Sequence, residues 1–281
     1  MRSPQIIPSG AACGAEVQGV DIAAPGAIMA EALQQAVAGH LAVVVRGQAL
    51  SDAQLLALGR LFGMPEAQGA SVLAGPSAPA AQQVVSSLAP PPRPTGSLGG
   101  GTAIWQSDLS YRVRPCSIAI LHARSLPSGG GGVCCANQYL AYDTLPDDLR
   151  AGIAGRMLLH DESLDNEGRL REGCDPVTDP RQAGGAQHRM VRIHPQTGRK
   201  ALYLGRRRNA YVIGLALEDS ETLLDRLWAH ATQPALLWRH DWRAGDTLIW
   251  DNRCVLYRHD ASAAVVGGEL LRVQIRGEMP R

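Results

Sequence analysis

The stretch AHATQPALLWRHDWRAGDTLIWDNRCVLYRHD, residues 229–260, decides the fold. Within it the apolar run DTLIWDN (246–252) follows a turn signal, RAGDT, at 243–247. Outward from this stretch the same alternation of short apolar runs and turns recurs, in LAVVVRG (41–47), SIAILHA (117–123), ALYLG (201–205) and LLRVQIRGE (270–278). The pattern predicts a mixed α/β protein that is mainly β, with a sheet-rich core and long excursions.

Two segments have the signature of helices. SDAQLLALGRLF (51–62) begins with Ser51 and Gln54 in capping-box spacing. EDSETLLDRLWAHAT (218–232) has acidic residues in its first turn and leucines along one face. A third and weaker helix is expected from Tyr142 onward.

Two stretches, 74–100 and 161–187, are predicted to be loops. Loops of this length within a compact domain are typical of lids and binding loops. Because no repeat and no linker interrupts the chain, we expect a single domain over residues 1–281.

The charge balance and the apolar runs limit the possible partners. Twenty-seven basic and 26 acidic residues leave a net charge of +1, which argues against nucleic-acid binding. No apolar run approaches the roughly 18–20 residues of a membrane span, and the first residues do not have the layout of a signal peptide. We therefore expect a soluble cytoplasmic protein with no nucleic-acid and no membrane partner.

The six cysteines show no C-x-x-C spacing, which argues against zinc-ribbon and thioredoxin-like sites. We expect free thiols in a reducing compartment. Cys135 is interpreted as inert, because a catalytic thiol needs a base or a positive charge beside it.

Segments spread over nearly the whole chain resemble the TauD/TfdA family of iron(II)/2-oxoglutarate dioxygenases. The resemblance is carried, in the family's order, by residues 14–22, 43–63, 96–111, 136–146, 194–211, 229–260 and 270–278. It implies a double-stranded β-helix, or jelly roll, flanked by helices. Family members are often dimers or tetramers, so the resemblance also implies a possible homo-oligomer.

The same resemblance locates the iron site. The family holds Fe(II) with a His-x-Asp pair and a distal histidine, and these positions correspond here to Gln106, Asp108 and Tyr257. Of the three, only Asp108 is retained. A neutral amide is a poor ligand, and a phenol with a pKa of about 10 must first lose its proton. We therefore predict weak or absent iron binding.

The co-substrate positions also differ from the family. The family's threonine falls on Val133 and its arginine on Gly268, and neither residue can anchor the far carboxylate of 2-oxoglutarate. A second family arginine, often turned toward substrate, is retained as Arg272. We therefore predict weak or absent 2-oxoglutarate binding and a retained site for a small anion.

Other polar residues have both structural and functional interpretations. His259 lies two residues beyond Tyr257 and could replace the distal histidine if the strand slipped. His188 and His194 are interpreted as structural, and His240 with Asp241 as surface residues. The basic run 206–208 is interpreted as a solvated face or a partner of carboxylates, with a contact to an anionic substrate as the alternative.

Three hypotheses for function stay open. The first is an enzyme acting on a small anionic, carboxylate-type substrate without the usual chemistry, with Asp108 as base, Tyr257 as acid, and Gln106 and Arg272 beside them. The second is a non-catalytic homologue that binds a ligand or a partner subunit. The third is an ordinary Fe(II)/2-oxoglutarate dioxygenase with an altered ligand set.

Overall fold

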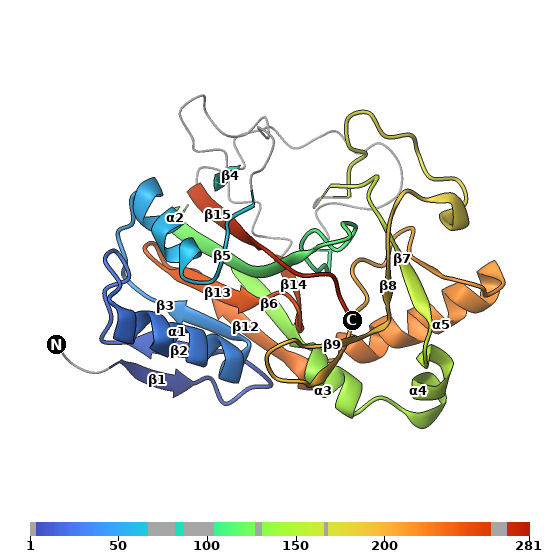
Figure 1. Cartoon of the computed structure of the whole chain (residues 1–281), viewed down its shortest axis with the longest axis horizontal. Coiled ribbons are helices and arrows are strands. Elements are labelled where there is room, and N and C mark those ends of the chain that lie inside the picture. The colour runs from blue at the N-terminus through green and yellow to red at the C-terminus, as the bar shows by residue number, and fades with distance from the viewer. Residues whose placement is uncertain (1–3, 67–81, 87–103, 127–130, 166–167, 260–268) are drawn as a thin grey trace.

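The computed structural model describes residues 4–66, 82–86, 104–126, 131–165, 168–259 and 269–281. A seven-stranded sheet occupies the left half of the molecule in Figure 1. The strand order is β1-β2-β3-β13-β5-β15-β4, and only the β2–β3 pair is parallel. The strands are β1 (Gln5–Pro8), β2 (Ala15–Gln18), β3 (Ala42–Val45), β4 (Gln82–Ser86), β5 (Cys116–Ser125), β13 (Thr247–Asp251) and β15 (Glu269–Arg276).

A second sheet, of three strands, packs against one face of the first. Its order is β12-β6-β14, with β6 (Gly132–Asn137) in the centre between β12 (Leu237–Asp241) and β14 (Val255–His259). Buried side chains from both sheets share one apolar cluster, including Leu121 and Trp250 from the large sheet and Val133 and Val255 from the small one. Two facing antiparallel sheets form the jelly roll that the sequence predicts.

Helices cover the other face of the large sheet. Leucines of α1 (Ala27–His40) and α2 (Asp52–Arg60) pack with Ile120 and Val273 in a second apolar cluster. The capping box at the start of α2 is present as predicted, with Ser51 as its first residue. Helix α1 was not predicted, since no side chain caps its first turn and no acidic residue lies there.

A long excursion between β6 and β12 supplies the remaining elements, which share a third apolar cluster. The predicted helix over 218–232 is confirmed as α5. The helix expected from Tyr142 is wrong as a single piece, because α3 ends at Asp143 and Pro146 precedes the first residue of α4. The elements are α3 (Gln138–Asp143), α4 (Asp147–Ile153), β7 (Met157–Asp161), η1 (Pro180–Gln182), β8 (Gly185–Arg189), β9 (Val191–Ile193), β10 (Lys200–Leu202), β11 (Tyr211–Val212), α5 (Leu217–Ala231) and η2 (Pro234–Leu236).

The predicted loops need one correction. Within 74–100 the residues 82–86 form β4, which pairs with β15, and the rest of that stretch lies outside the described residues. The described residues of the stretch 161–187, which exclude 166–167, are irregular apart from η1, the end of β7 and the start of β8, as expected. No helix in the described part of the chain combines the length and the apolar character needed to cross a membrane.

The cysteines form no disulfide, and all but Cys174 are buried. Burial raises the pKa of the Cys135 thiol well above its ordinary value. The pKa of the Cys13 thiol is raised to about 12 for the same reason. A thiolate is disfavoured at both positions, which supports the interpretation of Cys135 as inert.

Candidate active site

The backbone around Gln106 is fixed on both sides. The Gln106 N–H donates to the Tyr257 carbonyl at 2.8 Å, and the Tyr257 N–H donates back to the Gln106 carbonyl at 2.9 Å. On the opposite side the Ser107 N–H donates to the Gly205 carbonyl at 3.0 Å. The structure therefore brings Gln106, Asp108 and Tyr257 together, although the first and last are 151 positions apart in the sequence.

Five side chains form a continuous polar chain across the site. Arg206 Nη2 donates to Gln106 Oε1 at 2.8 Å, and Gln106 Nε2 donates to the Tyr257 hydroxyl at 3.1 Å. The Tyr257 hydroxyl in turn donates to Asp108 Oδ1 at 2.6 Å. Arg272 Nη1 lies 3.6 Å from the same Asp108 oxygen. This polar chain thus has a guanidinium at each end and a carboxylate next to one of them.

Asn252 holds Asp108 in place. Its Oδ1 accepts the Asp108 N–H at 2.8 Å, and its Nδ2 donates to the carbonyls of Asp108 and Cys116 at 3.0 and 2.8 Å. The Ser107 hydroxyl donates to the Asn252 carbonyl at 3.1 Å. Leu109, the next residue, has a φ of 55°, so the chain turns sharply after the carboxylate. Sequence reasoning missed this role of Asn252, although it lies in the WDNR motif quoted for the resemblance.

The polar chain is almost completely removed from water. Tyr257 is 1% exposed and Asp108 is 2% exposed. Burial, followed by the charge of Asp108, raises the pKa of the Tyr257 phenol well above its ordinary value, so the phenol keeps its proton. Burial also lowers the pKa of Arg206. Asp108 Oδ2 is buried and has no hydrogen-bond partner among the described residues, so one acceptor of the polar chain remains open.

The charges of the polar chain do not cancel. Gln106 is neutral and Tyr257 is held in its neutral form, which leaves the guanidiniums of Arg206 and Arg272 and the carboxylate of Asp108. These five side chains thus comprise two cations and one carboxylate, and the charges of Arg171 and Asp165 also act on Arg206.

The register of β6 against β14 places the other predicted residues. Val133 lies opposite His259, and Cys135 lies opposite Tyr257. The pairing from Val255 to His259 is regular, so the slip that would turn His259 into a ligand does not occur along these described strands. Instead the His259 ring packs edge-on against the Tyr257 ring, with centroids 5.6 Å apart.

Val133 is fully buried and lines the shared apolar cluster. Its side chain carries no hydrogen-bonding group, so it offers nothing to a carboxylate. Gly268, the other altered co-substrate position, lies outside the described residues.

The basic run 206–208 separates into three environments. Arg206 turns inward, where it also donates to the Leu164 carbonyl at 2.9 Å. Arg207 pairs with Glu221 and Asp225 of α5, each at 2.6 Å. Arg208 is exposed. The interpretation as a partner of carboxylates is therefore right for Arg207, whereas Arg206 contacts Gln106 of the predicted site.

The prediction for His240 is wrong, and that for His188 agrees with the structure. His240 is only 2% exposed and packs edge-on against the Trp242 ring, because it faces inward from β12, whereas Asp241 is exposed as expected. His188 has a structural contact, since its Nε2 lies 3.0 Å from the carbonyl of Ser110.

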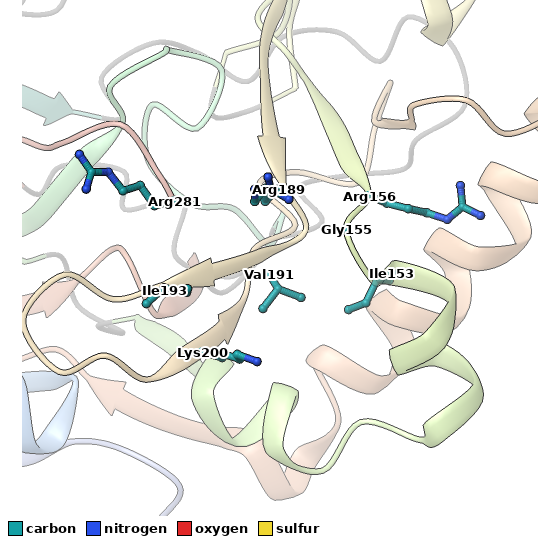
Figure 2. A pocket seen from close by; sticks show the side chains of 8 residues that line it. All are labelled: Ile153, Gly155, Arg156, Arg189, Val191, Ile193, Lys200 and Arg281. Atoms are coloured by element: carbon teal, nitrogen blue, oxygen red, sulfur yellow. The ribbon is translucent and has the colours of Figure 1, made fainter.

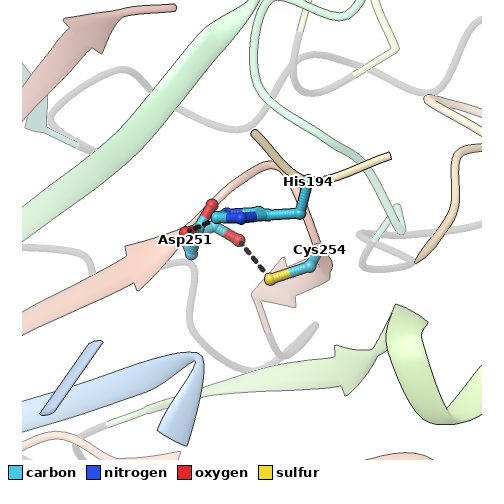
Figure 3. A group of neighbouring side chains, drawn as sticks. All are labelled: His194, Asp251 and Cys254. Carbon is cyan, nitrogen blue, oxygen red and sulfur yellow. Dashed lines mark hydrogen bonds and ion pairs between the residues drawn. The ribbon is translucent and has the colours of Figure 1, made fainter. Parts of the chain in front are cut away.

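A buried group at the end of β13 could in principle hold a metal ion, since ligand atoms of His194, Asp251 and Cys254 lie within 4.8 Å of one another (Figure 3). We call it the His194 cluster and include Arg253, which contacts both Asp251 oxygens at 2.8 and 2.7 Å. His194 Nε2 lies 3.0 Å from Asp251 Oδ2, and Nδ1 of the same ring accepts the Thr197 N–H at 3.3 Å.

The atoms of the His194 cluster that could bind a metal either accept hydrogen bonds already or carry a proton. Burial alone would raise the pKa of Asp251, but hydrogen bonds from His194 and Arg253 hold that pKa below its usual range. Burial raises the pKa of the Cys254 thiol well above its ordinary value. Since the imidazole lone pair and both carboxylate oxygens are engaged and the thiol keeps its proton, the cluster is better suited to bracing the end of β13 than to binding a metal.

Similarity to known proteins extends over most of the chain. Residues 5–273 match the family model described as taurine catabolism dioxygenase TauD, TfdA family. An (S)-phenoxypropionate/alpha-ketoglutarate-dioxygenase from Delftia acidovorans is 31% identical over 265 residues, which cover 90% of this chain and 88% of the relative.

Solved structures of related proteins have the same fold. A taurine dioxygenase from Burkholderia xenovorans matches with a TM-score of 0.81 at 27% identity, covering 99% of this chain and 91% of the other. The protein AAD-2, solved in complex with Mn(II) and N-oxalylglycine, matches with a TM-score of 0.78 at 26% identity, covering 99% of both chains. The likeness therefore includes the jelly roll and its flanking elements.

Proposed function

The chain belongs to the TauD/TfdA family, and from that premise we propose that it is an enzyme that binds a small carboxylate at the polar chain and acts on it without Fe(II) or 2-oxoglutarate. Its relatives have the names of enzymes, among them a dioxygenase and a pentalenolactone F synthase, which favours an enzyme. The observation that carries the proposal is the 2.6 Å hydrogen bond from Tyr257 to Asp108, set between two arginines.

Members of this family use Fe(II) and 2-oxoglutarate, and the donors present here do not fit that metal. Gln106 Oε1 already accepts from Arg206, and the raised pKa of Tyr257 keeps its oxygen protonated. Asp108 alone can offer an anionic oxygen. Ferrous iron in this family needs two imidazoles beside the carboxylate, and a divalent cation would also lie near the guanidiniums of Arg206 and Arg272. The proposed reaction therefore does not involve iron.

The co-substrate positions support the same proposal. Val133 provides no donor to a carboxylate. Arg272 is retained, but its Nη1 lies 3.6 Å from Asp108, so it balances this carboxylate. An incoming anion would share the two guanidiniums with Asp108, and its own donor group, a hydroxyl or an amine, would bond to the open Asp108 Oδ2.

The chemistry that this arrangement supports is proton exchange. Asp108 Oδ2 would accept a proton from one atom of the substrate, and the Tyr257 hydroxyl would give its proton to another. The carboxyl of Asp108 then rotates, so that its protonated oxygen takes the place of Oδ1 beside the Tyr257 oxygen, and the proton passes to that oxygen, which restores the starting state. One proton leaves the substrate and one is returned, as an isomerisation requires.

Metal and co-substrate titrations test the proposal directly. Calorimetry with Mn(II), and with Fe(II) under anaerobic conditions, is expected to show no saturable binding, with or without 2-oxoglutarate. The double variant Gln106→His, Tyr257→His should gain metal affinity by at least about tenfold, since two imidazoles replace an amide and a phenol. Stoichiometric metal with tight 2-oxoglutarate binding to the unmodified protein would instead establish the ordinary dioxygenase.

Carboxylate binding is tested separately. A panel of small hydroxy and amino acids is screened for an increase in Tm, which a ligand of the native state must produce. The increase should disappear in Arg272→Gln and persist in Arg276→Gln, a matched change at the exposed end of the same strand. If no carboxylate raises Tm and a stable partner protein co-purifies, the non-catalytic alternative replaces the proposal.

We also propose a single-domain, cytoplasmic homo-oligomer that does not bind nucleic acid. The buried thiols and the net charge of +1 support the compartment and the lack of a nucleic-acid partner. The oligomer rests on family analogy alone. Light scattering during gel filtration tests it.

A further inference from the structure

A hollow of about 260 Å³ lies on the surface between the turn after α4 and the β9–β10 hairpin. Its floor is apolar and is made by Ile153, which is buried, and Val191, which is partly buried. Ile193, at its edge, is 47% exposed and adds to the apolar surface of the hollow. Figure 2 shows Ile153 and Val191 close together, with Lys200 reaching toward them from the hairpin. The hollow shares no residue with the polar chain.

The rim of this hollow is basic. Arg189, Lys200 and Arg281 are exposed around it, and Arg156 lines it with its stem while its Nε donates to the Gly152 carbonyl at 2.7 Å. Among the residues that the structure describes, no carboxylate side chain lines the hollow.

Neighbouring arginines on the surface form ion pairs with carboxylates, in contrast to the basic residues of the rim. Arg199 pairs with Asp143 at 3.3 Å and Arg226 with Asp148 at 2.5 Å. Within the described part of the chain, none of the four basic residues of the hollow pairs with a carboxylate; the aromatic contact of Lys200 is with the Tyr142 ring, 5.8 Å from its centroid. The positive charge here is therefore locally unbalanced, although the whole chain is almost neutral.

We propose that this hollow is a binding site for a small amphipathic carboxylate, whose apolar body lies on Ile153 and Val191 and whose carboxylate is held by Arg189 and Lys200. The apolar floor excludes a bare inorganic anion as the preferred ligand, and the unbalanced rim favours an anion over a neutral apolar molecule. Ligand pockets usually exceed about 300 Å³, so the ligand is small, of the size of a medium-chain fatty acid or a single aromatic ring. This inference does not rest on the proposed function.

The test uses octanoate as the probe and ¹³C-labelled Ile and Val methyl groups as reporters. Saturable shifts are expected at the methyls of Ile153, Val191 and Ile193. The reversals Arg189→Glu and Lys200→Glu should each weaken the affinity by about tenfold, and added salt should weaken it further. Arg60→Glu is the matched control, because it changes the net charge equally at an exposed arginine outside the hollow.

Two further comparisons complete the test. Octanol, which lacks the carboxylate, should bind more weakly than octanoate. Arg272→Gln should leave the shifts unchanged, because the polar chain is a separate site. The proposal is overturned if these methyls do not shift, if octanol binds as well, if Arg60→Glu weakens binding as much as the rim reversals, or if the shifts depend on Arg272.

Discussion

The polar chain and the His194 cluster are built from similar groups and differ in how completely those groups are satisfied. Both are buried, and both pair a carboxylate with arginine. Asp251 accepts hydrogen bonds on both oxygens, with its arginine at 2.7 Å. Asp108 accepts on one oxygen only, and its arginine lies 3.6 Å away.

This difference indicates which buried charge is structural. A carboxylate with every lone pair engaged can contribute stability but has nothing left for a ligand. A carboxylate with an open oxygen has capacity for a ligand and contributes less to stability. The comparison predicts that damage to the His194 cluster costs stability, whereas damage to the polar chain mainly costs binding.

The largest effect is expected from Asp251→Asn. The substitution leaves the Arg253 guanidinium, whose side chain is 8% exposed, without its buried counter-charge. We expect a loss of about 3–5 kcal/mol in the free energy of unfolding, measured by urea denaturation. Asp241→Asn, on the exposed Arg239 pair, is the control and should change little. A loss no larger than in this control would show that the cluster is not a structural brace.

Tyr257→Phe should have a smaller effect on stability. It removes one hydroxyl and leaves the Gln106 donor and the Asp108 acceptor each without that partner. The expected loss is about 1–3 kcal/mol, together with the loss of any carboxylate-dependent increase in Tm. If stability falls as much as in Asp251→Asn while carboxylate binding survives, the polar chain is a second structural brace and the contrast fails.

A further contrast, between His194 and His160, predicts a pH dependence. His194 bonds to a carboxylate, whereas neither ring nitrogen of His160 has a partner among the described residues. Burial lowers the pKa of His160 well below 6.5, and that of His188 is lowered for the same reason. Below the unfolded pKa of about 6.5 the unfolded chain therefore binds more protons than the native one, so stability falls as the pH falls.

The size of that pH effect follows from the proton difference. Each of the two histidines contributes a slope of up to about 1.4 kcal/mol per pH unit below pH 6.5. Urea denaturation at pH 7, 6 and 5 measures it. A free energy of unfolding that stays constant over this range would mean that these rings gain a partner in solution.

The smallest effect is expected at the surface, where Arg226→Gln removes the exposed pair with Asp148. Both side chains are more than half exposed, so solvent screens the interaction. We expect no measurable change in Tm. A clear decrease would show that ion pairs on this surface contribute more than their exposure suggests.

Strands and helices could be predicted from the sequence where turn and capping signals mark their ends. Short apolar runs bounded by turns became β3, β5, β13 and β15, and the capping box began α2 at its predicted residue. Helix α1 lacks such signals: Gly26 precedes it without a side-chain hydrogen bond, and its end is marked only by Leu41 at a φ of 66°. Its stability comes from Leu33 and Val37 packing on the sheet, which no local pattern reports.

The sequence identified three residues of the site but not the hydrogen bonds that connect them to others. Motif spacing gave Gln106, Asp108 and Tyr257. The roles of Arg206 and Asn252 depend on contacts across 100 and 144 positions of sequence, which only the folded sheets create. His240 was taken for a surface residue, although alternation along β12 places it on the same face as Trp238.

The burial of the cysteines should allow a dye to be attached selectively at one position. Since Cys174 is the one cysteine that is not buried, an alkylating dye should attach there first while the native fold shields the other thiols. A single fluorophore could then be placed on the 161–187 loop without mutagenesis, and its emission would report ligand-induced movement of that loop. Labelling of further cysteines would in turn measure how often the interior opens.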